Sequence, residues 1–457
     1  MYVFFSCNVC PLTRCNVGQV VLIDKLPDVA LLSIFDFYVE EDLDTYQPTK
    51  KRIEVWQTLV HVCRRWRCIV FGFPRCLNLR LFYTETRPRA VEMLKVWPPL
   101  PVVIHGDFSF STVTLGLDNI IAALKHDYRI CDLSLHHPSS PQMEKVVDAM
   151  RQPFSSLSIL ELRLPKQSAL VALPDSFLGG SAPRLQTLVL EGILFQALPK
   201  LLLSTTRLST LSLLNVPHAG YISPDMMVTY LSTLTNLEHL CLGFPSPSSH
   251  PNHANHHSLL STRTVLPALT SLEFTGFSKY LEDLVAQIDA PVLDSFSLSF
   301  LDELAFDTPQ VIQFISRTPK LKEPEHAKLI FYDFDLQFIL PLPSPNVDEE
   351  DNEKAHLGTS ISLPFWQISS LAQARSSSLF PLSAVKRLVM REGDECDWGG
   401  EIDIEDVCWL LCPFTAVETL YLSDSLEPDI GPALPDLQGE RMAEILPALR
   451  DIVFHWR

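Results

Sequence analysis

The sequence is short of glycine, of positive charge and of long apolar runs. Its 457 residues include 16 glycines against 35 prolines, and 36 Lys or Arg against 54 Asp or Glu, which gives a formal net charge of −18. We find no run of about 18 or more apolar residues, so we expect no membrane-spanning helix. Phosphate neutralisation supplies most nucleic-acid affinity, and an acidic chain offers little of it. We therefore expect neither a membrane nor nucleic acid among its partners.

Catalytic and cofactor signatures are also missing. We find no G-x-S-x-G, no P-loop, no H-E-x-x-H and no dinucleotide-binding glycine pattern. We therefore expect a protein that is not an enzyme and needs no cofactor. The 11 cysteines form no regular disulfide framework, which favours reduced thiols and a cytoplasmic or nuclear location. The N-terminus has no positive region or long apolar core and is a weak signal peptide, so residues 1–22 are expected to form a loosely ordered extension.

Possible metal ligands occur in patterns that do not favour a metal site. One C-x-x-C lies near the N-terminus, but the second pair that a zinc site needs is missing. Histidines gather in the Pro- and Ser-rich segment 243–264, and flexible polar tracts seldom hold a functional metal. Two late cysteines have no local catalytic signature, and we expect them in the core. These residues are, in order, Cys7, Cys10 and Cys15; His250, His253, His256 and His257; Cys408 and Cys412.

An L-x-x-L-x-L pattern returns through most of the chain. The first seven occurrences start 23 to 32 residues apart and the last three 32 apart, a period typical of leucine-rich-repeat solenoids. A proline precedes most occurrences by two or four residues, so each repeat is predicted to run helix, proline, strand. The occurrences are 130–135, 157–162, 185–190, 208–213, 237–242, 269–274, 293–298, 385–390, 417–422 and 449–454.

Side-chain alternation along L-x-L determines which residues a partner can reach. The leucines point inward and stack between neighbouring repeats, while the residues between them face outward. We expect a protein target to bind these outward positions, with Glu161, Glu273 and Tyr421 as the leading candidates. Their polar and acidic character favours a partner with a basic or amide-rich surface. The full predicted outward set is Glu161, Thr187, Glu191, Thr210, His239, Glu273, Ser295, Tyr421 and Asp451.

Three segments are expected to interrupt the repeats as exposed loops. Segments 243–264 and 341–360 are rich in proline and polar residues, and the second is also acidic. Segment 391–407 carries eight carboxylates against Arg391. It is either a solvated acidic loop or a contact for a basic partner.

The region before the repeats has two apolar stripes at helical spacing. Leu31, Ile34, Phe35 and Tyr38 form one, after a helix start at Pro27 and Asp28. Val55, Leu59, Val62 and Trp66 continue to Ile69 or Val70 as a second, with arginines mostly off the stripe. Between residues 50 and 95, eleven Lys or Arg face three Glu, a balance of 11 − 3 = +8. This basic module on an acidic chain suggests a docking surface for an acidic protein.

This region resembles an F-box over residues 24–80. The link 39–54 between its helices is longer and more polar than in most F-boxes. With the repeats, the chain resembles the F-box proteins with irregular leucine-rich repeats that are abundant in mushroom-forming fungi. The implied fold is α/β, with a helical F-box at 23–80 followed by an irregular repeat solenoid at 81–457. The matching residues are Leu26, Pro27, Asp28, Ile34, Phe35, Leu59, Val62, Cys63, Arg65 and Trp66.

The resemblance implies a substrate-recognition subunit of a Skp–cullin–F-box ubiquitin ligase. Its partners would be an acidic Skp-type adaptor, through it a cullin, and an unknown protein target. A non-catalytic leucine-rich-repeat scaffold acting outside a ubiquitin ligase is the alternative, and adaptor binding separates the two. A nucleic-acid binder built on residues 50–95 ranks third, and salt-dependent binding to generic RNA or DNA would favour it. The adaptor-binding residues implied by the resemblance are Leu26, Pro27, Ile34, Phe35, Leu59, Val62 and Trp66.

Overall fold

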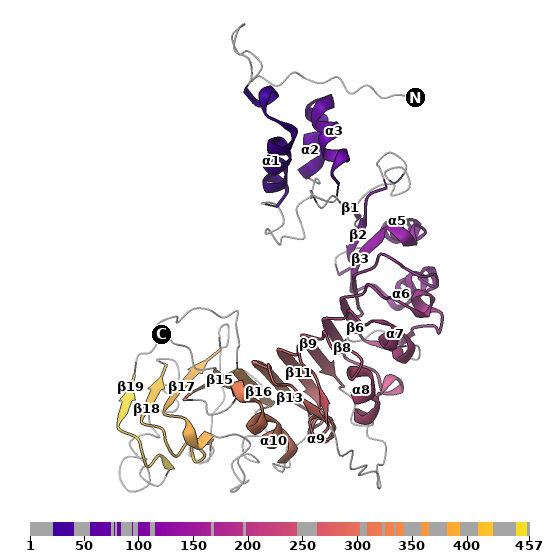
Figure 1. Cartoon of the computed structure of the whole chain (residues 1–457). Coiled ribbons are helices and arrows are strands. Elements are labelled where there is room, and N and C mark those ends of the chain that lie inside the picture. The colour runs from indigo at the N-terminus through magenta and orange to yellow at the C-terminus, as the bar shows by residue number, and fades with distance from the viewer. Residues whose placement is uncertain are drawn as a thin grey trace. The chain divides into compact units, whose positions relative to one another are not determined.

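The chain, in a computed structural model, forms two compact units, Met1–Phe82 with Glu92–Val103 and Tyr83–Val91 with Ile104–Arg457 (Figure 1). The described residues are 22–40, 55–74, 77, 80–83, 94, 99–109, 115–165, 169–194, 198–244, 263–301, 309–321, 325–332, 335–341, 358–364, 382–393, 410–423 and 445–454.

The first unit is built around α1 (Asp28–Glu40), α2 (Val55–Val62) and α3 (Arg64–Gly72), after the short 3-10 helix η2 (Leu22–Lys25). Each helix contributes large apolar side chains to one core. The rings of Phe35 on α1 and Trp66 on α3 have centroids 4.7 Å apart. The indole of Trp56 on α2 donates to the Arg80 carbonyl at 3.1 Å. The fully buried apolar residues of the three helices are Leu31, Phe35, Trp56, Leu59, Val60, Ile69 and Val70.

The stripe predicted as one helix from Val55 onward is two helices, so that prediction was wrong in this detail. Cys63 is extended, with φ −155° and ψ 171°, and its sulfur accepts the Trp66 amide as the N-cap of α3. The Arg67 guanidinium donates to the Val60 carbonyl at 2.9 Å, which ties the two helices together across the break. Because the helix axis changes at Cys63, Val62 leaves the buried stripe and is exposed.

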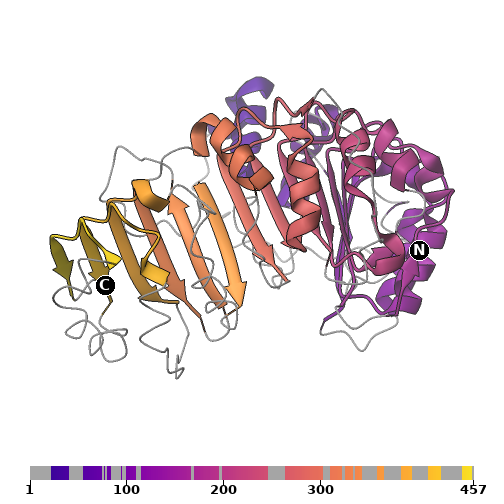
Figure 2. The same cartoon turned by 90° about the horizontal axis from the view of Figure 1, so that it is seen from below.

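A fifteen-stranded sheet runs through the repeats in the order β1-β2-β3-β4-β6-β8-β9-β11-β13-β16-β15-β14-β17-β18-β19 (Figures 1 and 2). Two short pairs, β10 with β12 and β5 with β7, lie outside it. The strands are β1 (Leu81–Tyr83), β2 (Val102–Asp107), β3 (Ile130–His136), β4 (Ile159–Arg163), β5 (Val171–Ala172), β6 (Thr187–Glu191), β7 (Ile193–Leu194), β8 (Thr210–Leu214), β9 (His239–Gly243), β10 (Thr264–Val265), β11 (Ser271–Gly276), β12 (Ile288–Asp289), β13 (Ser295–Phe300), β14 (His326–Phe331), β15 (Asp335–Pro341), β16 (Gly358–Pro364), β17 (Arg387–Glu392), β18 (Thr419–Leu422) and β19 (Asp451–Val453).

Helices cover one side of this sheet (Figures 1 and 2). The ends of several repeats are 3-10 turns: η3 (Asp127–Arg129), η4 (Phe177–Gly180), η5 (His218–Gly220), η7 (Pro319–Leu321) and η9 (Leu382–Ala384). An α-helix precedes β3, β4, β8, β9, β13 and β14, so the predicted order of helix before strand is confirmed for these repeats. The helices are α5 (Leu115–Leu124), α6 (Ser140–Ala149), α7 (Leu198–Ser204), α8 (Pro224–Leu231), α9 (Ser278–Val285) and α10 (Pro309–Arg317).

Each L-x-x-L-x-L occurrence places its last two apolar residues on a strand of the main sheet, except that Phe454 follows the end of β19. Leu160 and Leu162 of β4, for example, are both fully buried and pair in register with Leu188 and Leu190 of β6. Burying such a side chain is worth about 1.5–3 kcal/mol. Stacking neighbouring repeats is what provides that burial, as solenoid physics requires. The chain is thus a leucine-rich-repeat-like protein in its second unit.

An antiparallel pair that the sequence analysis missed interrupts the parallel sheet. β15 pairs with β16 on one side and with β14 on the other, antiparallel in both cases. β16 continues the parallel order from β13, and β14 continues it to β17. The pair therefore keeps the sheet continuous across the least regular part of the repeats.

The predicted loops are shorter than expected wherever the structure describes their ends. Pro341 ends β15 and Gly358 starts β16, so the loop predicted for 341–360 begins and ends within strands. Gly243 belongs to β9 and Thr264 to β10, at the two ends of the predicted loop 243–264. Arg391 and Glu392 of the predicted loop 391–407 belong to β17. The extension 1–21 and the interiors 245–262, 342–357 and 394–407 lie outside the described residues.

One buried carboxylate joins consecutive helices of the repeats. Glu282 on α9 is only 7% exposed, and its oxygens accept the amides of Gln310 at 2.9 Å and Val311 at 2.8 Å. These are unpaired donors of the first turn of α10, where negative charge is favourable. Glu282 therefore caps the next helix from the previous repeat.

Replacing Glu282 should weaken the repeat unit. We expect Glu282→Ala to lower the free energy of unfolding by about 1–3 kcal/mol, because it leaves buried helix N–H groups unsatisfied. Denaturant unfolding followed by circular dichroism measures this loss. The matched control Glu144→Ala, at an exposed site of α6, should change stability by no more than about 0.5 kcal/mol. Equal stability of the two variants would contradict the capping role.

Candidate functional site

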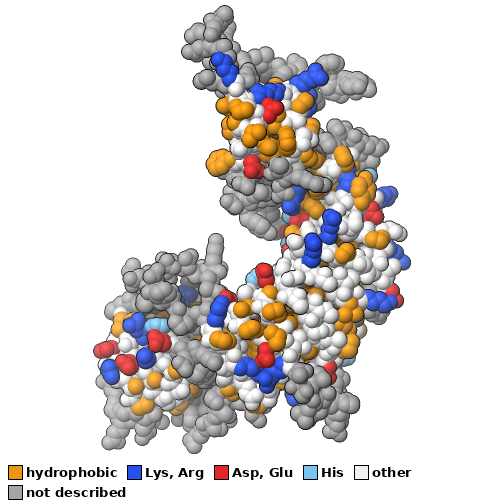
Figure 3. Space-filling model, viewed as in Figure 1, with side chains coloured by type: hydrophobic (Ala, Val, Ile, Leu, Met, Phe, Trp, Pro, Cys, Tyr) orange, Lys and Arg blue, Asp and Glu red, His pale blue; other side chains and the backbone are white. Residues whose placement is uncertain are grey.

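The first unit exposes large apolar side chains next to its core. Val29 is 75% exposed and Phe37 68%, and both lie on α1, which also buries Leu31 and Phe35. An exposed apolar patch of this kind marks a site of protein interaction in many proteins. Figure 3 shows hydrophobic side chains at the surface of the α1–α3 unit. We define the α1 patch as the exposed residues Val29, Ile34, Phe37, Tyr38 and Val62.

The seven predicted adaptor-binding residues fall into three groups by exposure. Phe35 and Leu59 are buried and build the core of the unit, so they can support a contact but not make one. Pro27, Ile34 and Val62 are exposed, and Leu26 and Trp66 are half-buried.

Sequence reasoning missed three exposed apolar residues, Val29, Phe37 and Phe73. The sequence did contain a signal for Val29 and Phe37, because α1 is apolar on more than the one stripe that its core needs.

An arginine fixes the start of α1 against α3. The Arg65 guanidinium donates to the Asp28 carboxylate at 2.6 and 3.0 Å and also to the Leu26 carbonyl. Two N–H groups of the guanidinium, on Nε and Nη2, converge on Asp28 Oδ1, and charge-assisted hydrogen bonds of this kind are stronger than neutral ones. The positions of Leu26 and Pro27 therefore depend on Arg65.

The three predicted target-binding residues lie on one face of the main sheet and in one register row. Register pairing leads from Glu161 on β4 to Val189 on β6, Ser212 on β8, Cys241 on β9 and Glu273 on β11. The same row continues through Ser297, Ser360, Ile339, Lys328 and Val389 to Tyr421. We call this side of the sheet, opposite α5–α10, the outward face. Their shared face was predicted correctly, and their role in binding stays a prediction.

The row is long compared with a short peptide. Four strand-to-strand steps separate Glu161 from Glu273, a span of about 19 Å at the usual strand spacing. Six more steps lead to Tyr421, a further span of about 29 Å. A partner that contacts all three residues must therefore be an extended segment or a folded domain.

Charged side chains form a connected ladder across the first strands of the outward face. His136 on β3 lies 3.4 Å from the Glu161 carboxylate on β4. Arg163 lies 3.7 Å from both Glu161 and Glu191. The Asn215 amide donates to Glu191 at 2.7 Å. We call His136, Glu161, Arg163, Glu191 and Asn215 the β3–β8 ladder. Partly exposed ion pairs of this length are weak, about 0–1 kcal/mol, so the charges stay available to a partner.

Two features of the ladder concern its protonation and hydrogen bonding. The hydrogen bond from His136, with the positive charge of Arg163 nearby, holds the pKa of Glu161 below its usual value although burial opposes this. Glu161 is therefore a carboxylate at neutral pH. The Nε atom of Arg163 is buried and has no hydrogen-bond partner.

The rest of the outward face differs in chemistry from the ladder. The middle strand β13 presents a row of hydroxyl groups, Ser295, Ser297 and Ser299. Burial, with the neighbouring Glu273 carboxylate, raises the pKa of Cys241 to about 12, so this thiol stays protonated. β14 and β17 carry cationic groups instead: Lys328, Arg387 and Arg391.

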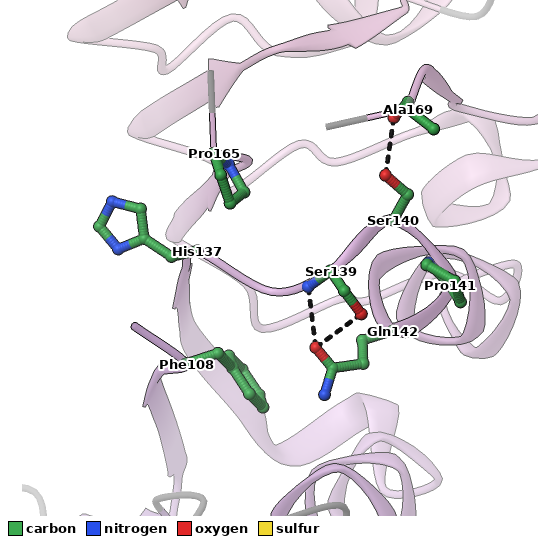
Figure 4. A pocket seen from close by; sticks show the side chains of 8 residues that line it. All are labelled: Phe108, His137, Ser139, Ser140, Pro141, Gln142, Pro165 and Ala169. Atoms are coloured by element: carbon green, nitrogen blue, oxygen red, sulfur yellow. Dashed lines mark hydrogen bonds between the residues drawn. The ribbon is translucent and has the colours of Figure 1, made fainter. Parts of the chain in front are cut away.

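A pocket of about 610 Å³ opens beside the start of α6 (Figure 4). Its polar groups largely satisfy each other: the Ser139 amide and hydroxyl both bond the Gln142 side-chain oxygen, and the Ser140 hydroxyl donates to the Ala169 carbonyl at 2.8 Å. His137 has a positive φ of 56° at its rim. The lining residues are Phe108, His137, Ser139, Ser140, Pro141, Gln142, Pro165 and Ala169.

Among the described residues, no group of three or more His, Cys, Asp or Glu is placed to hold a metal ion. No helix in the described ranges is long and apolar enough to cross a membrane. Cys412 was expected in the core, but it is exposed, so that prediction was wrong. It follows Leu411 in a turn and faces solvent. The N-terminal cysteines, the four histidines of segment 243–264 and Cys408 lie outside the described residues.

Comparison with known proteins adds little to this geometry. No protein-family model matches the chain, and no curated protein is similar to it. Solved structures that align with it include a TLR13–ssRNA13 complex, at 14% identity and a TM-score of 0.30, covering 80% of this chain and 44% of TLR13. The leucine-rich-repeat-containing protein LegL7 from Legionella pneumophila aligns at 13% identity and a TM-score of 0.27, covering 82% of this chain and 90% of LegL7.

This chain therefore spans less than half the length of TLR13. Both TM-scores lie below 0.5, and the repeat architecture rests on the strand register described above.

The lowered pKa of Glu161 predicts a pH dependence of stability. A carboxyl group with a depressed folded-state pKa contributes stability above its unfolded pKa of 4.5 and loses it as the pH falls through the folded value. We expect the stability difference between wild type and Glu161→Gln to be largest near neutral pH and to shrink below pH 4.5. Urea unfolding of both proteins across this range measures it. A difference that stays constant, or grows in acid, would contradict the ladder.

Proposed function

We propose that this chain is a non-catalytic substrate-recognition subunit of a Skp–cullin–F-box ubiquitin ligase. The α1–α3 unit binds a Skp-type adaptor, and through it a cullin, while the outward face of the repeat sheet binds a protein target. The observation that carries the proposal is the α1 patch: a small helical unit with the F-box sequence pattern leaves large apolar side chains exposed. The chain needs no cofactor for this function and acts in the cytoplasm or nucleus.

Charge and burial both support an acidic adaptor as the partner of the α1–α3 unit. Arg64 and Arg67 are exposed on α3, close in sequence to Val62 of the α1 patch. Apolar anchors within a charged rim are the usual anatomy of a stable protein interface. An acidic adaptor would cover the apolar anchors and pair with these arginines.

The repeat unit supports a protein target because its outward face is polar and ordered. The core leucines are committed to packing, so the residues between them are the positions that remain to contact a ligand. A non-catalytic scaffold acting outside a ubiquitin ligase would use the same two surfaces with other partners. Co-purification of a cullin with the adaptor-bound chain separates the two functions.

Charges placed in the α1 patch should abolish adaptor binding. We expect the double variant Ile34→Glu, Val62→Glu to weaken binding to a purified Skp-type adaptor by about a hundredfold, since both anchors would bury a charge. Isothermal titration calorimetry measures the affinity. Both residues are exposed, so the variant should fold like wild type.

The control is Val265→Glu, an equally apolar exposed residue in the repeat unit. It should bind the adaptor as wild type does. Unchanged affinity of the Ile34→Glu, Val62→Glu variant would contradict the proposal that the α1 patch binds the adaptor.

Target capture should depend on the long register row. We expect the triple variant Glu161→Gln, Glu273→Gln, Tyr421→Ala to lose a target that proximity labelling identifies with the wild-type chain, while adaptor binding stays intact. Quantitative capture of that target by purified chains is the measurement. The matched control Glu144→Gln, Asp148→Asn, Tyr128→Ala removes the same groups outside the main sheet and should capture normally. Capture by the first variant would move the target site to another surface.

A further inference from the structure

The β3–β8 ladder leads directly to the pocket beside α6. His136 belongs to the ladder and His137, the next residue, forms the pocket rim. Their imidazole rings lie edge to face, with centroids 6.3 Å apart. The His137 amide donates to the Arg163 carbonyl at 2.8 Å, so the rim is fixed to the strand that carries Glu161 and Arg163. Ladder and pocket are therefore neighbouring parts of one rigid surface.

The pocket offers apolar surface to an occupant beside its polar groups. Its serine and glutamine oxygens are already engaged with each other or with the backbone. The apolar surfaces of the lining are the ring of Phe108, the rings of Pro141 and Pro165, and the Ala169 methyl group. Its volume of about 610 Å³ lies within the range of about 300–1,000 Å³ usual for ligand pockets. A bulky aliphatic or aromatic side chain suits this lining.

The surroundings of the pocket are acidic. Asp107 accepts the Ser109 hydroxyl at 2.7 Å and lies 3.4 Å from the His137 ring. Partial burial works against its charge, but these hydrogen bonds and His137 hold the pKa of Asp107 below its usual value. Glu161 and Glu191 follow on β4 and β6, and Asp132 on β3. Arg163 is the single Lys or Arg among the described outward-facing residues of β2, β3, β4 and β6. The net charge here is negative.

We propose that the pocket and the ladder form one anchor site for the target, which binds a peptide segment with a bulky apolar residue close to a Lys or Arg. The apolar side chain enters the pocket, and the cation pairs with the ladder carboxylates, chiefly Glu161. This proposal rests on the proposed binding of a target to the outward face and specifies its chemistry. A large side chain in a pocket beside a charge-assisted contact is the usual composition of an interface hot spot.

The test uses the full-length chain and a display library of short random peptides. We expect enriched peptides to carry a Phe, Trp, Leu or Met within a few residues of a Lys or Arg. Fluorescence anisotropy with one enriched peptide then compares two variants. Ala169→Trp fills the pocket from an exposed position, and Glu161→Gln removes the carboxylate. Each should weaken binding about tenfold or more.

Asp148→Asn is the control for charge, because this exposed carboxylate of α6 pairs with Arg151 rather than with the ladder. It should bind the peptide as wild type does. Acidic or purely polar enriched peptides, the absence of enrichment, or binding indifferent to Ala169→Trp would each overturn the anchor site.

Peptide binding lost only in Glu273→Gln or Tyr421→Ala would also overturn the anchor site, while leaving target binding to the outward face intact. Adaptor affinity, measured in the same variants, reports separately on the ligase assignment.

Discussion

Burial of the paired leucines in each repeat is the constraint on which the rest of the structure depends. Alternation along a strand means that burying Leu160 and Leu162 turns Glu161 to the opposite side. Parallel pairing in register gives neighbouring strands the same inward and outward positions, since a slip of one residue would expose every leucine. The rows of the outward face are the consequence: Glu161, Glu273 and Tyr421 share one row because their neighbours are in the core.

The regular part of the fold was predictable for the same reason. Each L-x-x-L-x-L occurrence carries its own burial pattern, and the prolines mark the strand entry independently. β15 and β16 carry neither signal: DLQFILP and GTSISLP have no leucine pair at the repeat spacing. Their place depends on the parallel pairing of β16 with β13 and the antiparallel pairing of β15 with β14 and β16, which is tertiary information. The break at Cys63 was missed because both halves of the stripe keep helical periodicity.

The candidate sites were predictable in kind but not in detail. Periodicity located Phe35 and Ile34 on one helix, but only packing shows that Phe35 is buried and Ile34 exposed. Alternation placed Glu161 and Glu191 outward, but their link through Arg163 needs the register of β4 and β6. The pocket was invisible in the sequence, because it joins Phe108, Pro141 and Pro165 from the ends of different repeats.

We propose that adaptor and target bind separate surfaces, α1–α3 and the outward face of the sheet. Hydrogen–deuterium exchange of the full-length chain, with and without a saturating Skp-type adaptor, tests it most directly. We expect added protection of backbone amides in residues 22–40 and 55–74, with unchanged exchange in strands β3 to β13. Protection that appears on those strands, or no change in the helices at an adaptor concentration that saturates binding, would contradict it.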